Sequence, residues 1–342
     1  MTLLRRRLGR TDMKVTTVGL GSWALGGGGW AYGWGPQDDQ QSVRAIHHAL
    51  ELGINWIDTA AVYGLGHSEE VVGKAMKEVH GSRRPYIFTK CGLIWDESDR
   101  MAEARRVFTP EMVRMEVEAS LRRLDIDVID LYQVHWPPTE NSYNVQEAWG
   151  AMADLVDQGK VRAIGVSNFD IPLLEICESV RHVDSFQPPF SLIHREAGEE
   201  SIPWCRENET GVIVYSPMQS GLLTNGFSAE RLAGLAEDDW RRRSPDFQSP
   251  ALERNLALRD ALRLVASDHE VSVGAVAIAW TLAWPGVTGA IVGGRSPEQV
   301  DSWIAGASLG LTSEDMDRIA ASIERTGAGA GPVRPAMTRI GG

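Results

Sequence analysis

Four polar residues with complementary chemistry lie where apolar runs of the sequence stop. Asp58 follows INWI, Lys90 follows YIFT and His135 follows IDLYQV. Tyr63 lies just beyond Asp58, in DTAAVYG. Reduction of a carbonyl delivers hydride to carbon and requires an acid within hydrogen-bond reach of the oxygen. An aspartate, a tyrosine, a lysine and a histidine are the parts of such a proton-transfer site.

Each of the four residues has a task in that proton transfer. The phenol of Tyr63 has suitable geometry, but its free pKa is about 10. We expect the ammonium of Lys90 to lower this pKa, and the carboxylate of Asp58 to hold the ammonium in place and charged. His135 can hydrogen-bond the same carbonyl oxygen and orient it. Taken singly, the same residues also suit a turn, a solvated lysine, a structural histidine and a packed loop aromatic.

The elements along the chain must bring these residues together. Short apolar, β-branched runs alternate with amphipathic stretches of helical length, which indicates βα units and a parallel sheet. The predicted strands are Val18–Gly21, Ile54–Asp58, Tyr86–Lys90, Val128–His135, Ala163–Ser167, Ser185–Gln187, Val212–Tyr215 and Gly289–Val292. The predicted helices are Gln40–Leu52, Glu69–Val79, Pro110–Leu124, Gln146–Gln158, Ile171–Val180, Ile202–Asn208, Leu252–Ser267 and Pro297–Gly306. Eight pairs predict an α/β fold, the (β/α)8 TIM barrel, in which all strand C-terminal ends surround one pocket.

Three segments fall outside this alternation. RRRLGRTDMKVTTVG predicts an N-terminal β-hairpin with its turn near Gly9–Asp12. The helical segments Val273–Ala283 and Ser313–Glu324 are expected to be additions packed outside the barrel. Because no linker or repeat divides the chain, we expect residues 1–342 to form a single barrel domain. The Gly- and Pro-rich residues 327–342 predict a flexible tail.

Long loops and tryptophans gather at the expected catalytic end. The long strand-to-helix connections are Gly21–Asp38, Cys91–Pro110, Trp136–Val145 and Ser216–Pro250. Such loops in compact domains are usually functional or disordered. Five of the twelve tryptophans lie on them, namely Trp23, Trp30, Trp34, Trp95 and Trp136. They predict an aromatic substrate pocket, which suits an apolar, aromatic or sugar-like carbonyl compound.

Composition limits the class of protein. The chain is 43% hydrophobic and 23% charged, as in ordinary globular domains. The net charge of −12 argues against nucleic acid as a partner, and the short clusters Arg5–Arg7 and Arg241–Arg243 are expected to be solvated. No apolar run is long enough to cross a membrane, and the N-terminus lacks the apolar stretch of a signal peptide. Three cysteines without CxxC spacing favour a reduced, cytoplasmic location, and we expect no metal site. The oligomeric state stays open.

One motif near the N-terminus points to a different fold. Gly19 to Ala24 matches G-x-G-x-x-A, and Asp38 and Asp39 fall near the position of a ribose-binding acid. A Rossmann fold would require a helix to begin at the third motif position. The chain continues instead as LGGGGWAYGWGP, in which the glycines and Pro36 oppose a helix. We therefore reject the Rossmann interpretation.

The order of several motifs resembles a known family. DTAAVYG, TK, QVHWP, GVSNF and GGRSPEQV follow one another as in the aldo-keto reductases, over nearly the whole chain. GLGSWALGG and IVGGRSPEQ are most similar to bacterial members of the inositol-operon and general-stress type. The resemblance implies reduction of aldehydes or ketones with NAD(P)H. It also implies that Tyr63 is the general acid-base, that Lys90 and Asp58 tune it, and that His135 orients the substrate.

The resemblance further implies a nicotinamide cofactor site. Ser167, Asn168 and Gln187 would hold the carboxamide, and Tyr215 would stack on the nicotinamide ring. Ser216, Gly221 and Leu223 would surround the pyrophosphate, and Gly293 would also contact the cofactor. Arg295, Ser296 and Gln299 would reach the adenosine 2′-phosphate. An arginine there favours NADPH, with NADH as the alternative cofactor.

Two points depart from the family pattern or leave a choice open. Ser302 and Trp303 stand where relatives often carry Glu and Asn toward the adenine, so Trp303 either stacks on the adenine or packs in the core. The same catalytic residues would also serve an NAD(P)-dependent dehydrogenase that oxidises a sugar or cyclic polyol. A cofactor-sensing regulatory subunit with little turnover is a third function compatible with the sequence.

Overall fold

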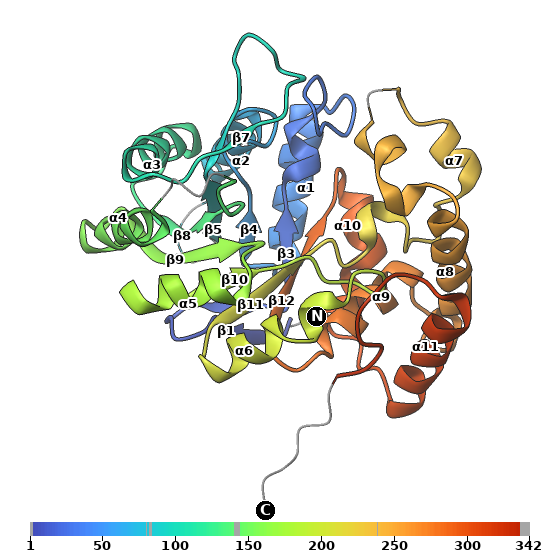
Figure 1. Cartoon of the computed structure of the whole chain (residues 1–342). Coiled ribbons are helices and arrows are strands. Elements are labelled where there is room, and N and C mark those ends of the chain that lie inside the picture. Colours follow the sequence, from blue (N-terminus) through green and yellow to red (C-terminus); the bar gives the residue numbers. More distant parts are fainter. Residues whose placement is uncertain (1–2, 80, 82–83, 140–143, 238, 336–342) are drawn as a thin grey trace, which may run out of the picture.

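Eight parallel strands close into a barrel in the computed structural model, which describes residues 3–79, 81, 84–139, 144–237 and 239–335. Around the barrel the order is β3, β4, β5, β8, β9, β10, β11 and β12, with β12 paired to β3 (Figure 1). Their bounds are β3 Val18–Gly21, β4 Trp56–Asp58, β5 Tyr86–Cys91, β8 Ile129–Val134, β9 Val161–Ser167, β10 Ser185–Gln187, β11 Gly211–Tyr215 and β12 Val287–Gly293. The predicted (β/α)8 barrel and all eight of its predicted strands are confirmed.

Helices surround the barrel on its outside (Figure 1). They are α1 Asp39–Glu51, α2 His67–Met76, α3 Pro110–Leu124, α4 Val145–Asp157, α5 Ile171–Val180, α6 Ser201–Glu207, α7 Ala229–Ala233, α8 Ala251–Asp268, α9 Val273–Leu282, α10 Pro297–Trp303 and α11 Ser313–Thr326. Several begin where a side chain caps the first turn. Thr109 accepts from the backbone N–H of Met112, and Ser296 accepts from that of Gln299. A proline follows each cap, where its missing N–H costs no helical hydrogen bond.

Two helices exchange the roles that the sequence predicts. All ten residues of α9 are buried, and α9 packs directly on β12. In contrast, α8 buries one side only and packs on α9 and α11. A helix that is apolar on every face suits the layer next to the barrel. The prediction that Val273–Ala283 is an outer addition is therefore wrong: α9 is the barrel helix, and α8 and α11 lie outside it.

The N-terminal hairpin, β1 Arg5–Arg7 and β2 Lys14–Thr16, is confirmed and covers one end of the barrel. Its apolar residues Leu8, Met13 and Val15 pack in the barrel interior together with Trp56. A Cβ added at Gly19 would overlap the Trp56 ring. The first glycine of the G-x-G motif thus makes room for a core tryptophan. This packing role explains why the motif occurs here without a phosphate-binding loop.

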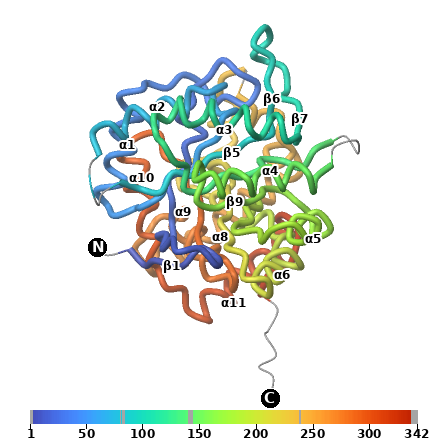
Figure 2. The backbone as a smooth tube through the Cα atoms, turned by 90° about the vertical axis from the view of Figure 1, so that its left-hand side faces the viewer, coloured from blue at the N-terminus to red at the C-terminus, as the bar shows by residue number. Residues whose placement is uncertain are grey.

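The long connections leave the opposite end of the barrel. The segment between β5 and α3 forms a small hairpin, β6 Leu93–Ile94 and β7 Arg105–Arg106, which lies far from β1 in both views (Figures 1 and 2). The segment between β3 and α1 begins with a 3-10 helix at Trp23–Gly26. Long loops therefore meet at the C-terminal ends of the strands, where the sequence predicts the site.

Part of the expected tail is anchored. The backbone N–H of Ala330 donates to Ile193 (3.0 Å), and that of Arg195 donates back to Ala330 (3.0 Å). The Arg195 guanidinium also donates to the carbonyl of Ala328, at 3.1 Å. Residues 328–331 are thus fastened to the loop after β10, whereas 336–342 lie outside the described residues. Within the described part of the chain, no helix is long and apolar enough to span a bilayer.

Candidate active site

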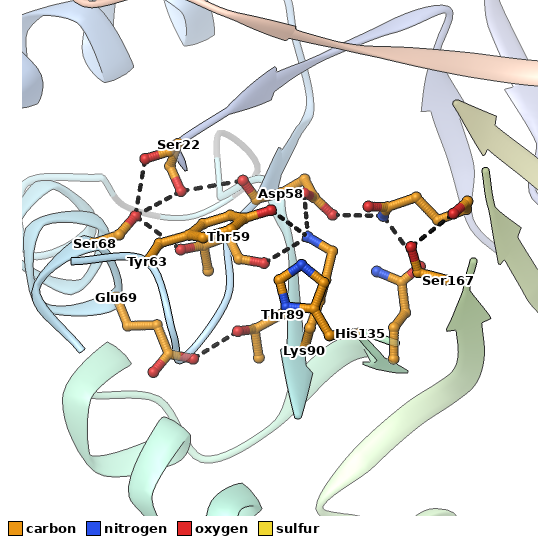
Figure 3. A network of polar contacts seen from close by, with 12 residues as sticks. Ser22, Asp58, Thr59, Tyr63, Ser68, Glu69, Thr89, Lys90, His135 and Ser167 are labelled. Atoms are coloured by element: carbon orange, nitrogen blue, oxygen red, sulfur yellow. Dashed lines mark hydrogen bonds and ion pairs between the residues drawn. The ribbon is translucent and has the colours of Figure 1, made fainter. Parts of the chain in front are cut away.

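The four predicted catalytic residues converge at the C-terminal ends of β4, β5 and β8 (Figure 3). The ammonium of Lys90 donates to Asp58 Oδ1 at 2.5 Å and to the Tyr63 hydroxyl at 3.4 Å. The ring of His135 meets the Tyr63 ring edge-on, with centroids 5.5 Å apart. Residues up to 77 positions apart in the sequence thus come together beside Tyr63, as the alternation of strands predicts.

Further hydrogen bonds fix the ion pair. Lys90 also donates to the carbonyl oxygen of Thr59 at 2.9 Å. Asp58 Oδ2 accepts from Gln187 Nε2 at 2.9 Å, and the same amide donates to Gln133 Oε1 at 3.2 Å. Asp58 and Lys90 are almost completely buried. A buried pair requires such partners, because lone pairs and N–H groups removed from water otherwise stay unsatisfied.

The pKa of Tyr63 differs from the sequence-based expectation. We expected the ammonium of Lys90 to lower it, but the pKa is raised well above 10. The main cause is burial, which penalises the phenolate, followed by repulsion from the Asp58 carboxylate. The sequence identified the neighbours of the phenol, whereas the depth of its burial depends on the folded loops. Tyr63 is therefore a neutral phenol at pH 7.

Burial also sets the charge states of the two basic residues. It lowers the pKa of Lys90, while Asp58 opposes this shift by favouring the ammonium. The pKa of His135 is lowered well below 6.5, mainly by burial and then by the positive charge of Lys90. His135 is consequently neutral at pH 7 and can donate one ring N–H. The site combines a neutral acid, an ammonium and a neutral imidazole.

A cluster of hydroxyl groups holds the turn that carries Tyr63, and the sequence did not reveal it. Ser68, in the first turn of α2, lies 2.8 Å from the Ser22 hydroxyl and 3.0 Å from the Thr59 hydroxyl (Figure 3). Its backbone N–H donates to the carbonyl of Tyr63 at 3.1 Å. Gly64 has a positive φ of 63°, and a Cβ there would overlap the first loop. The turn therefore has little freedom to move.

The residues predicted to hold the nicotinamide are linked to each other beside this site. Tyr215 donates its hydroxyl hydrogen to Asn168 Oδ1 at 2.8 Å. Asn168 Nδ2 donates to the carbonyl of His135 and to Ser167 Oγ, both at 3.0 Å. Ser167 in turn donates to the carbonyl of Gln187 at 2.7 Å. Ser167, Asn168, Gln187 and Tyr215 thus form one connected group that also touches Asp58 through Gln187.

The residues predicted to surround the pyrophosphate lie in the loop after β11. Ser216 and Gly221 have positive φ angles of 57° and 99°, and both are half-buried. The Leu223 side chain is buried in the core, and its N–H already donates to the carbonyl of Met218 at 3.1 Å. Ser216 and Gly221 therefore suit close approach of a ligand to the backbone better than Leu223 does.

The residues predicted for the adenosine end line a groove of about 620 Å³. Arg295, Ser296 and Gln299 form one side of it, and residues 36–38 with Gln41 form the other. Gly293 lies exposed at the end of β12, two residues before Arg295. Trp303 is only 2% exposed, so it packs in the core and does not stack on a ligand.

The predicted pocket tryptophans lie at different distances from Tyr63. Trp23 stacks on the Tyr63 ring, with centroids 6.1 Å apart and an angle of 21°. Trp34 meets Trp23 edge-on, with centroids 5.3 Å apart. Trp30 and Trp95 belong to the same apolar cluster as Tyr63 and Trp23. These positions give the site an aromatic wall.

Other aromatic and charged residues of these loops were predicted incompletely or wrongly. The guanidinium carbon of Arg106 lies over the Trp136 ring, 4.4 Å from the ring centroid. Trp240, which the sequence did not single out, stacks with Trp23, with centroids 5.2 Å apart. Its place in a long loop at the catalytic end was the available signal. Arg241 was expected to be solvated, but it is 8% exposed and paired with Asp239. Among the described residues, no group of side chains could hold a metal ion.

Known proteins with similar sequences and structures share this architecture. The model of the Aldo/keto reductase family matches residues 17–324. Aldo-keto reductase YhdN of Bacillus subtilis is 37% identical over 317 residues, which are 92% of each chain. The NADH-specific methylglyoxal reductase of Escherichia coli is 32% identical over 329 residues, 93% of this chain and 98% of that one. Glycerol dehydrogenase AKR11B4 from Gluconobacter oxydans is 36% identical, with a TM-score of 0.85 and coverage of 99% and 100%.

These matches cover nearly the full length of both partners, and the motifs of the site fall inside the matched region. The family predicted from the order of the motifs is confirmed, whereas the narrower likeness to inositol-operon members stays a prediction. The chain belongs to the aldo/keto reductase family.

Proposed function

We propose that the chain reduces aldehydes or ketones to alcohols with a nicotinamide cofactor, and that Tyr63 donates the proton. The arrangement around the Tyr63 hydroxyl carries this proposal. A buried ammonium lies 3.4 Å from that oxygen, and a neutral imidazole lies beside the same ring. A carbonyl oxygen in the space between Tyr63 and His135 would meet an acid and a hydrogen-bond donor at once.

The charge states support transfer of the proton toward substrate. Because the pKa of Tyr63 is raised, the phenol holds its proton at neutral pH and can release it to a carbonyl oxygen that becomes basic during reduction. The ammonium of Lys90 then faces the phenolate that remains and stabilises it. Asp58 holds this ammonium and keeps it charged despite burial.

The residues beside the proton donor fit a dinucleotide. A bound nicotinamide cofactor would supply the hydride. Gln187 Oε1 accepts no hydrogen bond within the described residues, so the group formed with Ser167 and Asn168 retains an acceptor for a carboxamide. Ser216 and Gly221 would hold the pyrophosphate, and Arg295, Ser296, Gln299 and Gly293 would hold the adenosine end. Arg295 supports NADPH as cofactor, with NADH as the alternative.

The walls of the site favour small carbonyl compounds with an apolar or sugar-like body. Trp23 stacks on Tyr63 and on Trp240, so indole surfaces approach the proton donor closely. The names of two relatives, a methylglyoxal reductase and a glycerol dehydrogenase, suggest methylglyoxal and glycerol as first substrates for the two directions.

A spectrophotometric assay tests the proposal. Purified protein is mixed with NADPH or NADH and a panel of aliphatic, aromatic and sugar aldehydes that includes methylglyoxal. We expect the absorbance of the reduced cofactor to fall, with kcat/KM for at least one aldehyde well above the rate without substrate. Tight cofactor binding without reduction of any aldehyde would contradict the proposal and support a cofactor-sensing subunit.

The reverse direction is the second candidate, favoured by the similarity to a glycerol dehydrogenase. The same residues serve oxidation, but there the phenolate of Tyr63 must accept the proton. A raised pKa makes that form scarce at neutral pH. We therefore expect kcat/KM at pH 7 to favour reduction, and a larger value for oxidation of glycerol or another polyol would assign the chain to the dehydrogenases.

A further inference from the structure

Asp38 lines the groove at Arg295, which would hold the adenosine end of the cofactor. The groove runs between the end of the first loop and the turn into α10. Asp38 caps α1, since its Oδ1 accepts the backbone N–H of Gln41 at 2.7 Å. The chain has no Rossmann fold, but Asp38 lines the same groove as Arg295, Ser296 and Gln299.

The cationic side of the groove is already engaged. Arg295 Nε donates to Gln37 Oε1 at 2.7 Å, and Nη1 donates to the carbonyl of Trp34 at 3.0 Å. Its Nη2 donates to the carbonyl of Pro36. Gln37 returns a hydrogen bond to the carbonyl of Arg295 at 3.0 Å. Three of the five N–H donors of the Arg295 guanidinium thus form hydrogen bonds to the first loop, and a phosphate would compete with these acceptors.

The negative charge of Asp38, on the other side of the groove, is not neutralised by an ion pair within the described residues. Asp38 is exposed. Asp239, whose charge acts on Arg295, is already paired with Arg241 at 2.6 Å. The groove therefore offers one guanidinium held by carbonyl groups and one carboxylate with a free oxygen.

We infer that Asp38 is a specificity-determining residue that shifts cofactor preference from NADPH toward NADH. A 2′-phosphate carries nearly two negative charges and is repelled by a carboxylate, whereas a 2′-hydroxyl can donate a hydrogen bond to it. The preference for NADPH is consequently weaker than Arg295 alone would give. This inference rests on the proposed function, because it takes the groove at Arg295 as the adenosine site.

The substitution Asp38→Asn isolates the charge. Asparagine caps helices as well as aspartate does, so its oxygen can still accept from Gln41. Asp39→Asn is the matched control, since it removes one charge from the next residue. The Asp39 side chain faces His67 at 2.9 Å and Lys74 at 3.9 Å instead of the groove.

Binding of two cofactor fragments to the full chain provides a readout that does not depend on turnover. Titration calorimetry compares 2′,5′-ADP, which carries the 2′-phosphate, with 5′-AMP, which lacks it. In Asp38→Asn we expect the ratio of the two Kd values to move by roughly five- to tenfold in favour of 2′,5′-ADP, as for one unit charge removed beside a phosphate through water. Asp39→Asn should leave this ratio within about twofold of the parent.

The outcomes separate this inference from the proposed function. An unchanged ratio in Asp38→Asn, or an equal shift in Asp39→Asn, would overturn the role of Asp38 even if the parent reduces aldehydes. Failure of both fragments to bind, together with active reduction, would overturn the assignment of the groove but not the reductase. A shifted ratio in a protein that reduces no aldehyde would support Asp38 and contradict the reductase.

Discussion

Replacement of Asp58 by asparagine removes one charge from the centre of the site and leaves its shape intact. The carboxylate faces the Lys90 ammonium at 2.5 Å and the Gln187 amide at 2.9 Å. The asparagine side chain could still accept one hydrogen bond, but Lys90 would lose its counter-ion in a place where burial already lowers its pKa. The neutral amine becomes more favourable, and the phenolate of Tyr63 loses the charge that stabilises it.

The size of the effect follows from burial of the pair. Removal of one partner of a buried ion pair costs about 3–5 kcal/mol of folding free energy. For 342 residues, an unfolding entropy of about 2.1 cal/mol/K per residue gives about 0.7 kcal/mol per degree. We therefore expect the Tm of Asp58→Asn to fall by about 4–7 °C, and kcat for aldehyde reduction to fall by at least about tenfold.

Asp130→Asn is the control for loss of a buried charge far from the chemistry. Asp130 is 2% exposed and accepts from Arg162 at 2.6 Å and from the backbone N–H of Ile87 at 2.8 Å. It lies near the start of β8, at the end of the barrel opposite the site. Calorimetry should show a lower Tm for both variants, and steady-state assays should show a lower kcat for Asp58→Asn alone. Full activity in Asp58→Asn, or an equal loss in Asp130→Asn, would refute the reasoning.

Three further predictions concern the pH dependence of activity, the pH dependence of stability and the rigidity of the turn that carries Tyr63. Because the pKa of Tyr63 is raised and that of His135 is lowered, kcat/KM for reduction should be flat between about pH 6 and 9, and an inflection near 6.5 would contradict the neutral imidazole. Burial raises the pKa of Glu116 to about 8, so the folded state binds the extra proton and parent stability falls as pH rises from about 4.5 to 8. The Glu116→Gln side chain can still accept the hydrogen bond from the Gly92 N–H but does not titrate. The Tm of this variant minus that of the parent should therefore increase between about pH 4.5 and 8. A Tm difference that does not change with pH would argue against a buried titrating carboxyl group at Glu116. Gly64→Ala places a Cβ against the first loop, at a residue whose φ is positive. The Tm and kcat of this variant should therefore both fall. A Tm equal to that of the parent would show that the turn carrying Tyr63 can adapt.

The barrel and the convergence of Asp58, Tyr63, Lys90 and His135 were predictable because local patterns encode them. Apolar runs of strand length end at polar residues, and a closed parallel barrel gives those ends one common location. The exchanged roles of α8 and α9 could also have been recognised, since VGAVAIAWTL is apolar on every face while α8 carries charges. The cofactor and catalytic roles of the site residues stay predictions.

Features that depend on packing between distant segments were not predictable. The bond from Gln187 to Asp58 joins residues 129 positions apart, and nothing near either residue indicates it. The same holds for the hydrogen bonds that join Ser68 to Ser22 and Thr59, and for the stacking of Trp240 on Trp23. The direction of the Tyr63 pKa shift was wrong because the sequence reveals charged neighbours but not how far water is excluded.

Substitution of Tyr63 by phenylalanine tests the central claim most directly. The variant keeps the ring that packs against Trp23 and His135 and removes only the hydroxyl group that would donate the proton. We expect cofactor affinity to stay within about twofold of the parent, while kcat/KM for aldehyde reduction falls by about 10²–10⁴-fold. A variant that binds the cofactor and reduces aldehydes at the parent rate would contradict the assignment of Tyr63 as proton donor.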